Sequence, residues 1–154
     1  MLDIPRPLDA AWPELMAGHL DRRDREMMEA LVTACALVAH ADGWVDGMER
    51  DQLLGFIRRR GLLVRIAPHE ILDAFDIRVR RLHEPDGPRS AIAALRPLAG
   101  WSRAALVVSA AESVAAADGT IHPGELRALR FVRAALTAPS WPRARGRKGR
   151  EGRA

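Results

Sequence analysis

A short acidic signature occurs twice in this chain, 76 residues apart, and each copy follows an alanine-rich apolar stretch. The copies span residues 42–49 (DGWVDGME) and 118–125 (DGTIHPGE), and both fit the pattern D-G-x-(V/I)-x-x-x-E. An amphipathic segment follows each copy. Because glycine permits the tight turn that joins two helices, the pattern predicts two related helix–turn–helix halves, each with carboxylates at its turn.

The rest of the sequence also favours helices. Apolar residues recur at helical spacing, tyrosine is absent, and the alternating β-branched and aromatic runs that are typical of strands are missing. The segment 84–88, which is rich in Pro and Gly, separates the two halves. The sequence therefore predicts an all-α, single-domain helical bundle of about seven helices built from two similar helix–turn–helix halves. The predicted helices span residues 8–17, 22–41, 46–60, 68–82, 89–98, 102–117 and 122–137.

Two of these helices are expected at the centre of the bundle. Segment 22–41 is apolar nearly all round after Met28, which is typical of a buried helix. Segment 102–117 is rich in alanine and serine, and such small side chains allow two helix axes to approach closely. We expect these two helices to pack against each other.

A basic tail accounts for the positive charge of the chain. The 154 residues sum to +4, but residues 138–154 hold six basic side chains against one acid, a net +5, which leaves −1 for residues 1–137. The tail is rich in Pro, Gly and Arg and lacks apolar periodicity, so it is predicted to be disordered. The predicted organisation is a helical domain over 1–137 and a basic tail over 138–154. Nucleic acid is not expected as a partner except through this tail.

No transmembrane or secretory segment is expected. The beginning of the sequence has no basic region followed by a long apolar stretch. Glu29, His40 and Glu112 interrupt the apolar stretches before they reach the roughly 20 residues that span a bilayer. Cys35, the single cysteine, lies in an apolar run and is expected to be an inert core thiol. These features predict a cytoplasmic protein.

Helix capping can explain the glutamate of each signature. In a capping box, the residue at the N-cap is followed three positions later by a glutamate whose side chain accepts the N-cap N–H. Both copies have this spacing, in Asp46 with Glu49 and in His122 with Glu125. Capping does not explain the leading aspartate of each copy, because a negative charge at the carboxyl end of a helix costs about 0.3–1 kcal/mol. Something positive is therefore expected beside Asp42 and Asp118.

A divalent cation is one candidate for that positive charge. Each signature resembles the second half of a calcium-binding loop, in which an acid, a glycine and a final glutamate hold fixed positions. The acids of the first half are missing from both copies, so each turn supplies only half a coordination shell. If the halves pack about a pseudo-twofold axis, the two half-shells can form one shared site for calcium, manganese or magnesium. The candidate ligands are Asp42, Asp46, Glu49, Asp118, His122 and Glu125.

These residues resemble those of a known family. The segments 30–57 and 115–125, each with an alanine-rich helix before D-G-x-(V/I)-x-x-x-E, are similar to the TerB family of tellurite-resistance proteins, and the resemblance covers about residues 8–137. It implies an all-α bundle of two similar halves and a bacterial cytoplasmic protein, peripheral to the inner membrane. It also implies a link to tellurite, oxidative or phage stress through membrane-associated Ter complexes.

The resemblance has consequences for the site as well. It carries over Asp42, Glu49, Asp118 and Glu125 as the acidic cluster of the family. The chain departs from the family at Trp44, at His122 in place of an acid, and in its basic tail. A related domain in membrane-anchored J-domain co-chaperones implies an adaptor role as an alternative.

Two hypotheses follow. The first is a TerB-like stress-response binding protein whose carboxylate cluster takes a divalent cation. The second is a metal-free adaptor or co-chaperone-type interaction domain whose acidic turn and Trp44 dock a protein partner. No nucleophile elbow, phosphate-binding loop or Cys-x-x-Cys motif occurs. An enzyme is therefore not expected.

Overall fold

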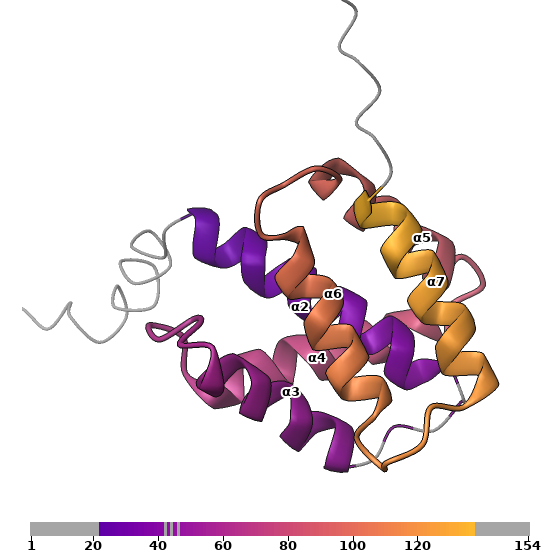
Figure 1. Ribbon diagram of the computed structural model, residues 1–154, viewed down its shortest axis with the longest axis horizontal. Coiled ribbons are helices and arrows are strands. Elements are labelled where there is room, and N and C mark those ends of the chain that lie inside the picture. Colours follow the sequence, from indigo (N-terminus) through magenta and orange to yellow (C-terminus); the bar gives the residue numbers. More distant parts are fainter. Residues whose placement is uncertain (1–21, 42, 44, 46, 138–154) are drawn as a thin grey trace, which may run out of the picture.

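The computed structural model describes residues 22–41, 43, 45 and 47–137, and these form an all-α bundle (Figure 1). The predicted fold class is confirmed. The helices are α2 (Arg22–His40), α3 (Gly47–Arg59), α4 (Pro68–Leu82), α5 (Gly87–Leu95), the 3-10 helix η1 (Arg96–Leu98), α6 (Ala104–Ala115) and α7 (Pro123–Thr137). The helix predicted at 8–17 and the tail 138–154 lie outside the described residues.

Helix α2 is the centre of the bundle, as predicted. Every residue of the segment 30–39 is buried, and α4, α5, α6 and α7 all pack against α2. Thr33 is the one polar side chain in this segment. Burying the segment therefore removes apolar surface from water while few polar groups lose their hydration. Burial also raises the pKa of the Cys35 thiol, which confirms the expected inert core cysteine.

Helix α6 packs against α2 through small side chains. Ala110 and Ala111 are fully buried on α6, and the predicted contact between the two alanine-rich helices is confirmed. Helix α6 also contacts α3 and α7, so it joins the two halves of the bundle. Two side-chain contacts support these junctions. Gln52 Nε2 on α3 donates to Ser113 Oγ on α6 at 2.7 Å, and Arg133 Nη2 on α7 donates to Glu112 Oε1 on α6 at 2.7 Å.

The segment predicted as one helix over 89–98 differs from the prediction. It forms α5 to Leu95 and then the 3-10 helix η1. Pro97 has no N–H to continue the α-helical hydrogen bonds, so the chain tightens into a short 3-10 turn. At the other end, a Cβ added to Gly87 would collide with the carbonyl of Arg81. Glycine therefore allows α5 to begin directly against the end of α4.

Candidate functional site

The two acidic turns share one backbone conformation. In each turn, the residue before the aspartate and the glycine after it both donate to the carbonyl three positions back. These bonds are Ala41 N to Val38 O (3.1 Å), Gly43 N to His40 O (2.8 Å), Ala117 N to Val114 O (3.1 Å) and Gly119 N to Ala116 O (2.9 Å). The glycines have φ angles of 78° and 86°, a left-handed conformation that side chains with a Cβ disfavour. The repeated glycine is thus required by the turn.

The two turns lie at the same end of the bundle, where α2 and α6 end and α3 and α7 begin (Figure 1). Gly124, in the first turn of α7, lies directly against Ala41, since a Cβ added to Gly124 would be 2.9 Å from the Ala41 carbonyl oxygen. The start of α7 therefore contacts Ala41, the residue that precedes Asp42. Asp42 and Asp46 themselves lie outside the described residues, as does Trp44.

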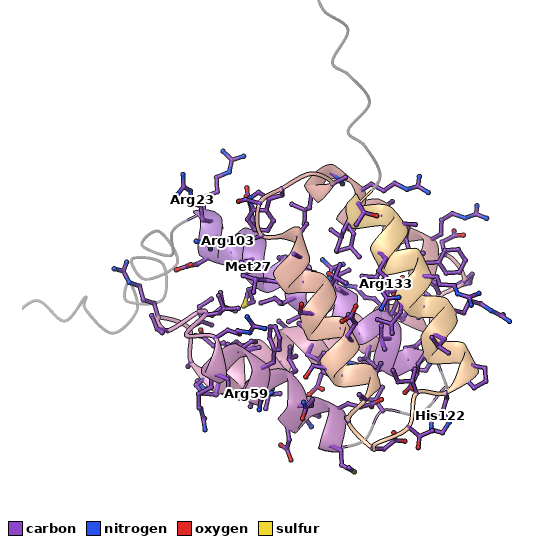
Figure 2. The ribbon with its side chains drawn as sticks, in the orientation of Figure 1. Arg23, Met27, Arg59, Arg103, His122 and Arg133 are labelled. Carbon is purple, nitrogen blue, oxygen red and sulfur yellow. The ribbon has the colours of Figure 1, made fainter. Side chains whose placement is uncertain are left out.

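In the second turn, Asp118 is held by local donors. Its Oδ1 accepts the backbone N–H of Thr120 at 2.9 Å, and its Oδ2 lies 3.0 Å from Nε2 of His122, the residue labelled in Figure 2. The hydrogen bond from the Thr120 N–H, followed by that from the His122 ring, lowers the pKa of Asp118 below its ordinary value of 3.8. These contacts supply the stabilisation that the helix dipole does not, so the position of Asp118 is explained by groups within the turn.

Glu125 caps the amino end of α7. Its Oε2 accepts the backbone N–H of His122 at 2.8 Å, and the residue is only 3% exposed. This is the half of the capping box that the spacing predicts. The His122 side chain reaches Asp118 with its ring nitrogen. The corresponding Glu49 in α3 is also buried.

The structure gives partial information on the predicted cation ligands. Within 22–41, 43, 45 and 47–137, no three or more His, Cys, Asp or Glu side chains converge in a way that could hold a metal ion. Of the six candidates, Asp118 and His122 contact each other through their side chains, whereas the Glu125 carboxylate accepts the backbone N–H of His122. Glu49 is a buried residue of α3. The shared site also needs Asp42 and Asp46, so it stays a prediction.

A groove that sequence reasoning missed lies beside the paired turns. It has a volume of about 600 Å³ and runs between α5 and α7, with the end of α2 on its floor. Its apolar lining includes Leu37, Ile92, Ala128 and Phe131, and its basic lining consists of Arg89, Arg96 and Arg127, with His40 near Ala41 and Gly124. Phe131 is 52% exposed. An exposed Phe on an amphipathic helix was the one available sequence signal, but its exposure depends on how α5 is placed.

The comparison with known families is decisive here. The model of the family described as Tellurite resistance protein TerB matches residues 28–147. The chain belongs to the TerB family. This match includes both acidic turns and every helix from α3 to α7. No curated protein and no solved structure matches the chain significantly. Among the helices of this TerB-family chain that the structure describes, none is both long and apolar enough to cross a membrane.

Replacing the capping glutamate separates its hydrogen bond from its charge. Glu125→Ala removes the acceptor of the partly buried His122 N–H and should lower the free energy of unfolding by about 1–3 kcal/mol. Glu125→Gln keeps an oxygen acceptor and should cost clearly less. Urea denaturation of both variants measures the difference. An equal loss in both variants would show that the charge, rather than the cap, stabilises this turn.

The aspartate should contribute pH-dependent stability. Because folding lowers the pKa of Asp118 from 3.8, its contribution is present above that value and is lost as the pH falls through the lower, folded-state pKa. Asp118→Asn keeps the Oδ1 acceptor but removes the charge. Melting temperatures measured from pH 5 downward should therefore converge for wild type and variant as the pH falls. Asp73→Asn, an exposed acid on α4, is the control for loss of one negative charge, and parallel curves for Asp118→Asn would contradict the prediction.

Proposed function

We propose that this TerB-family protein acts in tellurite resistance by binding a protein partner through the α5–α7 groove, without catalysing a reaction. The observation that carries the proposal is the groove itself, which exposes apolar side chains of two helices between arginines. Contiguous apolar surface bordered by polar groups is typical of an interaction site.

The acidic turns support this proposal in a structural role. Glu125 and Asp118 are engaged in hydrogen bonds within their own turn. They fix the start of α7 against Ala41, and both Ala41 and Gly124 line the groove. The turns thus hold one end of the groove in place. A membrane-associated Ter complex, which the family resemblance implies, is the candidate partner, with the protein working in the cytoplasm beside the inner membrane.

Filling the groove should abolish protection against tellurite. Ala93 is exposed, lines the groove and lies on α5, so Ala93→Trp places a large side chain in the groove without disturbing the core. Ala94 is also exposed on α5 but lines a different, smaller cavity of about 250 Å³, which makes Ala94→Trp a matched control. In a tellurite-sensitive bacterium that expresses each form, survival should fall to the vector level with Ala93→Trp and stay near wild type with Ala94→Trp. Equal survival with both variants, at equal protein levels, would refute the proposal.

A second candidate function is binding of a divalent cation between the paired turns. One observation favours it: the start of α7 lies against Ala41, next to Asp42, so the two acidic turns are neighbours in the fold. Carboxylates and backbone carbonyls are the oxygen donors that calcium prefers, and manganese and magnesium also accept them. Asp42, Asp46, Glu49, Asp118, His122 and Glu125 would be the ligands.

Calcium or manganese should raise the melting temperature if this site exists. An ion at a hundredfold excess over its dissociation constant stabilises the folded state by about 2.7 kcal/mol. The double variant Asp42→Asn and Asp118→Asn should remove the shift, whereas Glu70→Gln with Asp73→Asn, which changes two exposed acids of α4, should retain it. Scanning calorimetry with millimolar ion measures both. No shift in the wild-type protein would rule out the cation site while leaving the groove proposal intact.

A further inference from the structure

The α5–α7 groove is built by two helices that run in the same direction. The backbone N–H of Gly100, just after η1, donates to the Leu136 carbonyl near the end of α7 at 3.3 Å, so the carboxyl ends of the two helices lie together (Figure 1). Ile92 on α5 and Ala128 and Phe131 on α7 form the apolar walls, and Leu37 of α2 lies between them. The result is an elongated groove with apolar walls.

The groove is about two helical turns long. Its lining extends from Pro88 on α5 to Arg96 at the start of η1, and on α7 from Gly124 to Phe131. These intervals are eight and seven residues, which correspond to about 12 Å and about 10.5 Å at 1.5 Å per residue. A helix that lies in a groove presents its apolar side chains at i, i+3 or i+4, and i+7. The groove is therefore about as long as the apolar stripe of such a helix.

The charged side chains that border the groove are all basic. Arg89 borders it on α5, Arg96 borders it at the start of η1 and Arg127 borders it on α7, and none of the described residues that line it is acidic. None of these three arginines forms an ion pair with another described residue. At two other helix junctions, by contrast, Arg78 and Arg133 pair with glutamates at 2.7 Å. The groove therefore has an apolar floor and positively charged edges on both sides.

From this geometry we infer that the groove binds an amphipathic helix of a protein partner, with an apolar stripe over two turns and Asp or Glu on both flanks. This inference rests on the proposed function and specifies the chemistry of the partner. Apolar side chains at i, i+4 and i+7 enter between Ile92 and Phe131. Carboxylates on one flank, seven residues apart, reach Arg89 and Arg96, and a carboxylate on the other flank reaches Arg127. Complementary charge sets the register and selects against basic helices.

Binding of a defined peptide to the full-length protein tests the inference. The probe is a fluorescent helical peptide of about 14 residues, or four turns, with leucines at i, i+4 and i+7 and glutamates on both flanks. Fluorescence anisotropy should show saturable binding. A peptide with lysines in place of the glutamates should bind at least about tenfold more weakly. Ala93→Trp should weaken binding of the acidic peptide by at least about tenfold, and Ala94→Trp should leave it unchanged.

Charge reversal on the protein provides the second measurement. Arg89→Glu with Arg96→Glu should reverse the preference, so that the lysine peptide binds more tightly than the glutamate peptide. Arg58→Glu with Arg59→Glu changes two exposed arginines of α3 outside the groove and should retain the original preference. Circular dichroism of all four proteins confirms that each is folded.

The outcomes separate this inference from the proposed function. Equal binding of the acidic and basic peptides, or binding that Ala93→Trp does not weaken, would overturn the inference. Failure of the acidic peptide to bind, together with saturable binding of decanoate that Ala93→Trp abolishes, would also overturn it and assign the groove to a small anionic amphiphile. If Ala93→Trp removes tellurite protection but no acidic helix binds, the proposed function stands and this inference falls. If the acidic helix binds as expected while tellurite survival is unaffected, the inference stands and the proposed function falls.

Discussion

The contact between Gly124 and the carbonyl of Ala41 is the constraint on which this end of the molecule depends. The backbone of α7 approaches the end of α2 so closely that an added Cβ would lie 2.9 Å from the carbonyl oxygen, and only glycine avoids that approach. Both residues also line the groove between α5 and α7. One close backbone contact therefore positions the second acidic turn and the groove at the same time.

Two residues that both signatures share, the glycine and the final glutamate, have local physical reasons. Gly43 and Gly119 adopt left-handed conformations that end one helix and redirect the chain. Glu49 and Glu125 are buried, and a carboxylate is tolerated inside a protein when hydrogen bonds compensate its lost hydration. For Glu125 the His122 N–H supplies that compensation. The turn thus combines a backbone requirement with a buried cap, and this combination accounts for most of the signature without a ligand.

The sequence was informative about the helices and less so about the surfaces between them. Helix starts at Pro68 and Pro123 could be predicted because proline fits the first turn of a helix, and the central place of α2 followed from its lack of a polar face. The end of α5 was missed because Pro97 was placed inside a longer helix, although it lacks the required donor. The contact of His122 with Asp118 depends on side-chain orientation, which spacing alone does not determine. The groove depends on the relative placement of α5 and α7, which are separated in sequence by the 27 residues 96–122, so no local pattern indicates it.

The two candidate functions share the structural element that joins them. A cation between the turns would lie beside Asp42 and Asp118, and a helix in the groove would lie beside Ala41 and Gly124. Two ligands at neighbouring sites influence each other's affinity by direct electrostatic interaction or by changing the relative stability of the same two conformations. Here both ligands would act on the contact between the start of α7 and the end of α2. A ligand that leaves this contact unchanged has no conformational effect on the other site. A conformational dependence of partner binding on a cation would therefore require movement of α7 at Gly124, where a backbone contact without side chains leaves little room for a gradual shift.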